Sequence, residues 1–226
     1  MIHINNLSYR YPDGTLALDG VDMSIEKGEF VALIGKNGCG KTTLVRHLNA
    51  LLTPTEGSIS VFGMDTKDRS GVWNIRQTVG MVFQNPQTQF VGTTLEEDIA
   101  FGPENLTLPP NEIRKRVDRS LREVGLLEYK THAPNALSGG QMQRAAIAGV
   151  LAMEPECIVF DEVTSMLDPE SRGNVLDTIG QLHQNGKTII YVTQRIEEIL
   201  PLADRIVSMN NGRIEFVGTP QEYLAS

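Results

Sequence analysis

The stretch "FVALIGKNGCGKTT", residues 30–43, decides the fold of this chain. Its first five residues form an apolar run that is typical of a strand buried on both faces, as in a parallel sheet. The residues that follow fit the pattern G-x-x-x-x-G-K-[S/T], with Gly35, Gly40, Lys41 and Thr42 at the fixed positions. A strand, a glycine-rich loop and a helix in this order predict a P-loop, in which backbone N–H groups and the positive end of the helix hold phosphate.

The residues of this loop have separate expected tasks. We expect Lys41 to reach the outer phosphates and Thr42 to offer its hydroxyl to Mg²⁺. A glycine-rich connection without a ligand is the alternative, but the flanking strand and helix favour the phosphate site. The further residues expected to line the phosphates are Asn37, Gly38, Cys39, Gly40 and Thr43.

A pair of carboxylates follows another apolar run. The stretch "CIVFDEVTSMLD", residues 157–168, places Asp161 and Glu162 at the end of a buried strand. In a P-loop protein an acidic residue at this point holds the Mg²⁺ shell. Its neighbour Glu162 is then well placed to orient or deprotonate an attacking water. Two carboxylates after a strand also fit a solvated turn, but beside a P-loop they predict a hydrolytic site.

A second candidate anion site lies in "ALSGGQMQRAAIAG", residues 136–149. Ser138 and Gln141 have the spacing of a capping box, so a helix is expected to begin here with its first N–H groups exposed. Such a helix start attracts anions. A single domain therefore carries two phosphate-binding loops that are far apart in the sequence.

The pattern along the chain predicts an α/β fold. Apolar runs at residues 30–34, 79–83, 157–160 and 188–192 are expected to be strands of a parallel core sheet, with helices at 41–52, 141–153 and 169–184. The rest of the first forty residues and the stretch near 57–62 read as antiparallel strands. The polar, proline-bearing segment 87–134 is expected to be a helical insertion between two strands of the main sheet.

The composition limits the possible functions. The chain has 226 residues, 40 % hydrophobic residues and a formal net charge of −8. This acidic balance argues against a nucleic-acid partner, which needs a basic patch. No apolar run reaches the roughly 18 residues of a membrane-spanning helix. The two cysteines, Cys39 and Cys157, and the four scattered histidines indicate neither a disulfide nor a zinc site.

The order of the motifs GKNGCGKT, VFQNP, LSGGQ, VFDE and SMLD resembles the ATP-binding cassette (ABC) transporter ATPases over essentially the whole chain. The resemblance implies a P-loop NTPase with one domain, 1–226, an N-terminal antiparallel β-subdomain and a helical subdomain at about 87–150 that includes the signature motif. The stretches VWNIRQTVG, FQNPQTQFVGTTLEEDIAFGPEN and TSMLDPE are closest to the ATPase subunits of energy-coupling factor transporters, which import vitamins or cobalt and nickel ions.

The resemblance also assigns roles to single residues. Tyr11 matches the aromatic residue that stacks on adenine, for which a π face is suited. Gln84 matches the glutamine that touches Mg²⁺ and water and links the site to the membrane partner. Asp168 matches the loop aspartate that crosses the dimer interface. The signature motif consists of Ser138, Gly139, Gly140 and Gln141.

One position departs from the family pattern. The stretch "IIYVTQRIEE" ends the last core strand with Gln194, where the family usually has a histidine. A glutamine amide still donates a hydrogen bond, but it stays neutral and carries no proton. The expected catalytic residues are therefore Lys41, Glu162 and Gln194. A catalytically weakened or regulatory subunit is an alternative that Gln194 favours and the intact Lys41, Asp161 and Glu162 oppose.

The resemblance further implies the partners. ATP and Mg²⁺ are the expected cofactors, held in a dimer with a second ABC ATPase, identical or paralogous, whose signature motif completes each site. A transmembrane coupling subunit, and through it a substrate-binding membrane subunit, places the chain on the cytoplasmic face of the membrane. Its docking surface is expected beside Gln84, on the helix entered at "GTTLEEDIAF" with Glu97 and Asp98. Two competing hypotheses are the ATPase of another ABC importer type and an ATPase that acts on DNA or the ribosome.

Overall fold

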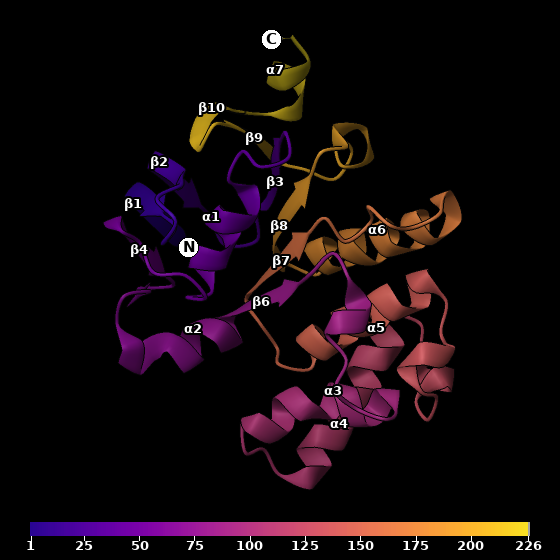
Figure 1. The fold of residues 1–226 in the computed structure, drawn as a ribbon. Coiled ribbons are helices and arrows are strands. Elements are labelled where there is room, and N and C mark those ends of the chain that lie inside the picture. Colours follow the sequence, from indigo (N-terminus) through magenta and orange to yellow (C-terminus); the bar gives the residue numbers. More distant parts are fainter. Residues whose placement is uncertain (226) are drawn as a thin grey trace.

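The larger sheet of the molecule carries the P-loop. The computed structural model describes residues 1–225, and this sheet has six strands in the order β10-β9-β3-β8-β7-β6 (Figure 1). Strands β3, β6, β7, β8 and β9 run parallel, and β10 pairs with β9 in the antiparallel sense. Their bounds are β3 Phe30–Gly35, β6 Val79–Val82, β7 Cys157–Asp161, β8 Thr188–Thr193, β9 Arg205–Asn210 and β10 Arg213–Gly218. The four predicted parallel strands are present, and β9 is an addition.

Strand β3 shows why the apolar runs have no alternation. Val31 and Leu33 pack into the core on one face of the sheet, whereas Phe30, Ala32 and Ile34 pack into the core on the other face. A strand that is buried on both faces needs apolar residues at successive positions. The unbroken apolar pattern of residues 30–34 therefore indicates a strand in the centre of the sheet.

A second sheet is formed mainly by the N-terminal residues. It has four strands in the order β2-β1-β4-β5, and all its pairings are antiparallel, as predicted. The bounds are β1 Ile2–Arg10, β2 Leu16–Ile25, β4 Glu56–Val61 and β5 Met64–Asp65. The core on the Val31 face of β3 includes side chains of β1, β2 and β4, so this sheet covers that face together with helix α1 (Lys41–Leu48).

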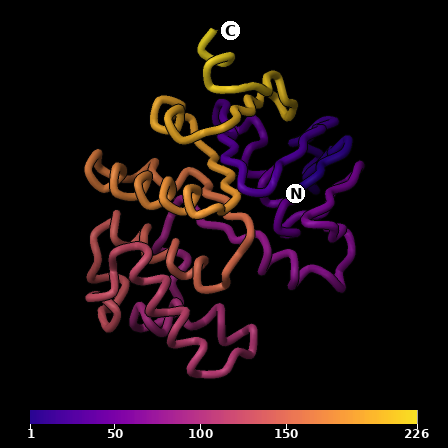
Figure 2. The backbone as a smooth tube through the Cα atoms, turned by 180° about the vertical axis from the view of Figure 1, so that it is seen from behind, coloured from indigo at the N-terminus to yellow at the C-terminus, as the bar shows by residue number. Residues whose placement is uncertain are grey.

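Two helices lie in the segment 87–134 that the sequence predicts to be a helical insertion, namely α3 Leu95–Asn105 and α4 Pro110–Glu123. Helix α5, Gly139–Leu151, follows this segment, and the short α2, Val72–Thr78, precedes β6. Helices α3 and α4 lie at the end of the molecule opposite the C-terminus in both views (Figure 1, Figure 2). The boundaries of a separate helical subdomain remain a prediction.

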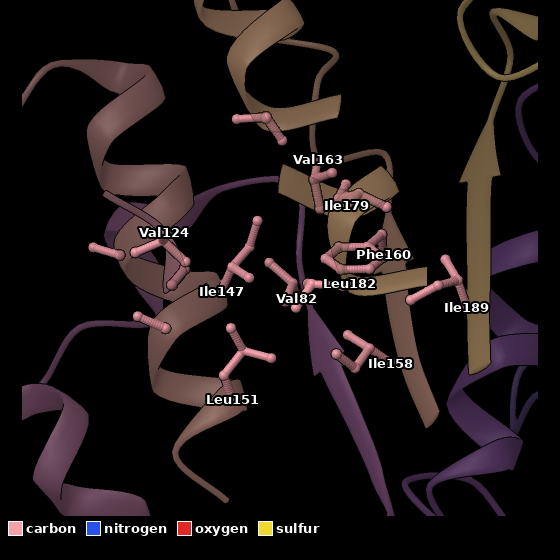
Figure 3. Close-up of a cluster of buried hydrophobic side chains, with 14 of the residues drawn as sticks. Val82, Val124, Ile147, Leu151, Ile158, Phe160, Val163, Ile179, Leu182 and Ile189 are labelled. Atoms are coloured by element: carbon pink, nitrogen blue, oxygen red, sulfur yellow. The ribbon is translucent and has the colours of Figure 1, made fainter. Parts of the chain in front are cut away.

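Helix α5 connects the insertion to the main sheet. Figure 3 shows Ile147 and Leu151, one turn apart on α5, on the side that faces Val82 of β6 and Phe160 of β7. All four are buried in the same core. Burial of each such side chain contributes about 1.5–3 kcal/mol to the stability of the fold. The signature motif at the start of α5 is therefore held by a packed element.

Helix α1 differs from its predicted extent. It ends at Leu48, with Asn49 as its C-cap, and not at residue 52. Ala50 has a φ of 54°, a left-handed conformation that does not continue a right-handed helix. The C-terminal helices are α6 Pro169–Gln184, as predicted, and α7 Pro220–Ala225. Within residues 1–225, no helix combines the length and apolar character needed to cross a membrane.

Candidate functional site

The P-loop joins the carboxyl end of β3 to the start of α1. Gly40, just before the helix, has a φ of 110°, and a Cβ at this position would lie 2.6 Å from the carbonyl oxygen of Ala17. Only glycine fits such a backbone. Cys39, within this loop, is buried, with 5 % of the residue exposed. We therefore expect its backbone, and not its thiol, to face a bound phosphate.

Lys41 is folded back onto its own loop. Its Nζ donates hydrogen bonds to the carbonyl oxygens of Gly35, at 2.8 Å, and Lys36, at 3.1 Å. It also lies 3.9 Å from Oε1 of Glu162. The residue is only 4 % exposed, and a buried ammonium needs such partners. These contacts hold the positive charge at the point where the phosphate loop meets the expected catalytic acid.

The expected metal ligands meet directly. Thr42 Oγ1 donates to Asp161 Oδ1 over 3.1 Å, and burial raises the pKa of the Asp161 carboxyl. Magnesium prefers oxygen ligands and is usually held by one or two carboxylates together with waters and substrate phosphates. Within residues 1–225, no cluster of three or more His, Cys, Asp or Glu side chains forms a metal site of its own. One hydroxyl and one carboxylate beside a phosphate loop fit Mg²⁺ that is bound together with phosphate.

Glu162 begins the loop after β7 in an unusual conformation. Its φ is 54°, a left-handed value that costs a non-glycine residue about 1–3 kcal/mol. Its N–H donates to the carbonyl oxygen of Val192 on the neighbouring strand β8, at 3.0 Å. The conformation is therefore fixed by the sheet itself. Such local strain at the end of a core strand is common at functional sites.

Gln194 connects the three loops at this edge of the sheet. Its Nε2 donates to Asn37 Oδ1 over 2.6 Å and lies 3.4 Å from Glu162 Oε1. Strands β3, β8 and β7 are neighbours and parallel, so the loops at their carboxyl ends meet, as is general for α/β sheets. The P-loop, Asp161, Glu162 and Gln194 thus form one site, as the sequence predicts.

Gln84 contacts this site indirectly. Its Nε2 donates to Ser165 Oγ over 3.0 Å, and Ser165 Oγ donates to the carbonyl oxygen of Glu162 over 2.8 Å. The amide therefore reaches the loop after β7 rather than the pair of expected metal ligands. Its role as a Mg²⁺ ligand stays a prediction. The sequence does not predict the contact with Ser165, because no sequence pattern indicates which hydroxyl a loop amide reaches.

Tyr11 also lies close to the P-loop. Its hydroxyl is 2.9 Å from Thr43 Oγ1, and its ring meets Tyr9 edge-on with the centroids 4.9 Å apart. The residue is half-buried. The hydroxyl contact holds the ring beside the helix that follows the P-loop, and the adenine-stacking role stays a prediction.

The signature motif lies in another part of the molecule. Ser138 and Gln141 form the predicted capping box, with Ser138 N–H donating to Gln141 Oε1 at 2.9 Å and Gln141 N–H to Ser138 Oγ at 3.3 Å. Asp168 caps α6 through the N–H groups of residues 170 and 171, and these hydrogen bonds lower the pKa of its carboxyl. The capping box confirms the predicted start of α5.

This second site does not meet the P-loop within the chain. Ser138, Gly140, Gln141 and Asp168 line one shared hollow, whereas Gln194 lines hollows with the P-loop and with Glu162. Figure 1 shows α5 well separated from α1. Of the predicted site residues, the structure thus brings the P-loop, Asp161, Glu162 and Gln194 together and leaves the signature motif and Asp168 apart.

Comparison with known proteins decides the family. Residues 18–165 match the sequence profile of the family described as ABC transporter, which is more than half of the 226 residues. The chain belongs to the ABC transporter family. This ABC ATPase is 57 % identical over 225 residues to the energy-coupling factor transporter ATP-binding protein EcfA of Methanosarcina acetivorans, and the match covers 100 % of the chain and 82 % of the relative.

Solved structures agree with this family. The structure of CbiO1 from Clostridium perfringens, part of the ABC transporter complex CbiONQ, matches with a TM-score of 0.92 and 37 % identity over 100 % of this chain and 90 % of that chain. The ATP-binding cassette MJ0796, solved as a dimer with ADP and phosphate, matches with a TM-score of 0.86 and 31 % identity over 97 % and 99 %. The fold is that of an ABC ATPase, and the chain is an ATP-binding ATPase of this kind.

Proposed function

We propose that this ABC ATPase is the energy-coupling subunit of a membrane importer of the energy-coupling factor type. The observation that carries the ATPase part of the proposal is the meeting of Lys41, Asp161, Glu162 and Gln194 around one P-loop, which joins phosphate binding to water activation. The likeness to EcfA and CbiO1 supports the importer class. Vitamins or cobalt and nickel ions are the proposed class of cargo.

The proposed chemistry divides the work among the residues of the site. Lys41 and the loop N–H groups hold the outer phosphates of ATP and stabilise the charge that develops on them. Thr42 and Asp161 hold Mg²⁺, which neutralises phosphate charge when bound. Glu162 orients or deprotonates the attacking water, and Gln194 donates a hydrogen bond beside it.

We assign the completed ATP site to two chains. The signature motif and the P-loop lie in separate hollows of one chain, so neither hollow alone surrounds a nucleotide with both. A second ABC ATPase, identical or paralogous, supplies the missing half to each site. In such a pair with two-fold symmetry each chain gives and receives the same groups, and the dimeric neighbour MJ0796 supports this arrangement.

The membrane partner is proposed to dock beside Gln84, at a surface hollow next to the start of α3. This docking hollow is lined by Gln87, Phe90, Gly92, Thr93, Ala133, Pro134, Asn135 and Met142. Through that partner the chain is placed peripherally at the cytoplasmic face of the membrane, and a substrate-binding membrane subunit completes the importer.

Two acids expected in this docking surface also have a structural task. The carboxylate of Glu97 accepts hydrogen bonds from the N–H groups of Thr93, at 3.1 Å, and Thr94, at 3.2 Å. The carboxylate of Asp98 accepts from the N–H groups of Val91, at 2.6 Å, and residue 92, at 3.0 Å. Both acids fix the loop that enters α3, and their part in docking stays a prediction.

The test is a turnover and assembly experiment. The purified chain with MgATP is expected to release phosphate, and Lys41→Ala is expected to abolish this release. Purification of the chain from its native membranes in mild detergent, followed by mass spectrometry, is expected to recover a transmembrane coupling subunit and a second ABC ATPase. Failure to recover any transmembrane partner from these membranes would contradict the importer assignment, even if the purified chain releases phosphate. Recovery of the partners from a chain that releases no phosphate would favour a regulatory subunit.

A further inference from the structure

Glu198 lies outside the motifs, yet its carboxylate joins three segments around the site. It ends the short 3₁₀ turn Ile196–Glu198, which follows β8 and Gln194. Its side chain is only 11 % exposed. A carboxylate that is this deeply buried needs several partners, and the structure provides them from separate parts of the chain.

Each oxygen of this carboxylate has a partner. Oε2 accepts the hydroxyl of Thr164, in the loop after β7, over 3.1 Å. Oε1 lies 3.3 Å from Nη1 of Arg172, in α6. The same oxygen lies 3.3 Å from Nη1 of Arg195, which directly follows Gln194. Glu198 therefore connects the loops at the ends of β7 and β8 to each other and to α6.

The proton order in this cluster follows from the donor inventory. A threonine hydroxyl has a single proton, and Thr164 donates it to Glu198. The Tyr191 hydroxyl, 2.8 Å from Thr164 Oγ1, must then donate to Thr164. Burial raises the pKa of Tyr191, which keeps this donor protonated. The chain Tyr191 to Thr164 to Glu198 is thus directional and fully partnered.

A further contact extends the cluster along the loop after β7. Nη2 of Arg172 donates to the carbonyl oxygen of Leu167 over 3.1 Å. Thr164 and Leu167 bracket the exposed residues 165 and 166, so this loop is held at both ends by groups that Glu198 orders. In a buried network of this kind each hydrogen bond supports the geometry of the others.

We propose that Glu198 is a positioning residue that sets the distance between Glu162 and Gln194. This inference rests on the proposed function, in which those two groups act on the attacking water. Glu162 lies two residues before Thr164, and Gln194 lies four residues before Glu198. The hydrogen bond between Thr164 and Glu198 therefore ties together the loops that carry Glu162 and Gln194. Hydrolysis is sensitive to misplacement of about 1 Å, which costs about 100-fold in rate.

The charge of Glu198 is tested by Glu198→Gln in the purified chain with MgATP. We expect kcat to fall about 10- to 100-fold, because the loops lose their common anchor, while the KM for MgATP changes less than about threefold. Glu29→Gln is the matched control. The Glu29 carboxylate pairs with Arg205 Nε at 2.7 Å, and the two side chains are 15 % and 23 % exposed, against 11 % and 23 % for Glu198 and Arg172.

The control separates positioning from stability. Glu29 precedes β3 at its amino end, at the opposite edge of the sheet from the site. Both variants are expected to lower the melting temperature, since each removes the charge of a largely buried carboxylate that pairs with arginine. Only Glu198→Gln is expected to lower kcat. Equal kcat values for the two variants overturn the proposal.

The hydroxyl of Thr164, which donates to Glu198, provides a second test. Thr164→Ser keeps the hydroxyl and is expected to retain kcat within about threefold, whereas Thr164→Val removes it at nearly constant volume and is expected to match the loss in Glu198→Gln. The double variant of Thr164→Val with Glu198→Gln is expected to lose no more than either alone. Normal kcat in Thr164→Val overturns the proposal even if Glu198→Gln fails to fold.

Glu162→Gln distinguishes failure of this inference from failure of the proposed function. Loss of turnover in Glu162→Gln together with normal turnover in Glu198→Gln overturns the positioning role alone. Normal turnover in Glu162→Gln overturns the proposed catalytic site and the positioning role together. Loss of turnover in both variants, with the KM preserved, supports both.

Discussion

The side-chain amide of Gln194 joins the P-loop to the candidate catalytic acid, because its Nε2 donates to Asn37 Oδ1 at 2.6 Å and lies 3.4 Å from Glu162 Oε1. The amide is neutral and has two N–H donors, so a single residue serves both loops. Gln194 is exposed, which leaves it free to exchange these partners for a phosphate. The bridge therefore holds Glu162 beside the P-loop without adding a charge.

Gln194→His is expected to raise kcat about tenfold or more at nearly unchanged nucleotide affinity. The ring donates a hydrogen bond at similar reach and also carries a proton near neutral pH, and a tenfold gain corresponds to about 1.4 kcal/mol in the transition state. Lys41, the loop N–H groups and Mg²⁺ supply most of the phosphate contacts, so binding is expected to persist. Steady-state phosphate release measures this, and an unchanged kcat would show that glutamine serves equally well.

Glu162→Gln is expected to keep ATP binding and nearly stop hydrolysis. The substitution preserves the shape of the side chain and removes the carboxylate that acts on the water, which is worth about 10²- to 10⁴-fold. Loss of its charge also removes the ion pair with Lys41, at 3.9 Å, so ATP binding is not expected to weaken. Size-exclusion chromatography with ATP should show a persistent dimer. Rapid turnover would transfer the water-activating role to another group.

The two-chain site predicts rescue between inactive variants. Lys41→Ala removes phosphate binding, and Gly139→Asp places an acid at the first turn of the signature helix, where it repels an anion. A Cβ at Gly139 would meet only Leu167 Cδ2 at 3.6 Å, whereas one at Gly140 would lie 2.6 Å from Ser171 Cβ. Gly139 is therefore the position that accepts a side chain without a clash.

Mixing these two inactive chains is expected to restore part of the turnover. A mixed dimer has one site with an intact P-loop from one chain and an intact signature motif from the other, while its second site carries both defects. The measurement is phosphate release against the mixing ratio, with each variant alone as the control. A mixture that never exceeds its components would refute the assignment of the signature motif to the partner.

The sequence predicted the fold and the centre of the site for a clear physical reason. Apolar runs buried on both faces of a sheet identify parallel strands, and the loops at their carboxyl ends must meet, so Lys41, Asp161, Glu162 and Gln194 could be placed together in advance. Strand β9 could not be predicted because its residues, RIVSMN, mix polar and apolar side chains. The apolar stretch within β9 is too short to be distinguished from a loop by its pattern alone.

Contacts that depend on side-chain reach could not be predicted. The expected docking role of Glu97 rests on the family resemblance, and no sequence pattern indicates that its carboxylate also accepts hydrogen bonds from the N–H groups of Thr93 and Thr94. The bridge from Glu198 to Thr164 depends on the packing of two loops from different strands. Periodicity gives the face on which a residue lies, and it carries no information on the partner that a flexible side chain selects.

The contact between Gln84 and Ser165 predicts a variant that separates basal hydrolysis from coupling. Nε2 of Gln84 donates to Ser165 Oγ at 3.0 Å, and Ser165 in turn donates to the carbonyl oxygen of Glu162 at 2.8 Å. Gln84 lies three residues before Gln87, which lines the proposed docking hollow, so we expect these two hydrogen bonds to link that surface to the loop of the catalytic acid. Ser165→Ala removes the link and leaves the proposed catalytic groups in place.

We expect Ser165→Ala to reduce the stimulation of turnover by the membrane partner while basal turnover stays within about threefold. Each hydrogen bond contributes about 1 kcal/mol, which corresponds to about 2–4 °C in a chain of this size. The loss of two hydrogen bonds is therefore expected to lower the melting temperature by no more than about 8 °C. Ser70→Ala is the matched control, because Ser70 Oγ also makes an exposed hydrogen bond, to Asp68 Oδ1 at 2.7 Å, far along the chain from the site. Phosphate release with and without the co-purified membrane subunits measures the effect. Ser70→Ala loses a hydrogen bond of the same kind away from Gln84 and Glu162. Equal stimulation of the two variants by the membrane subunits would therefore show that docking of the partner acts on Glu162 by another route.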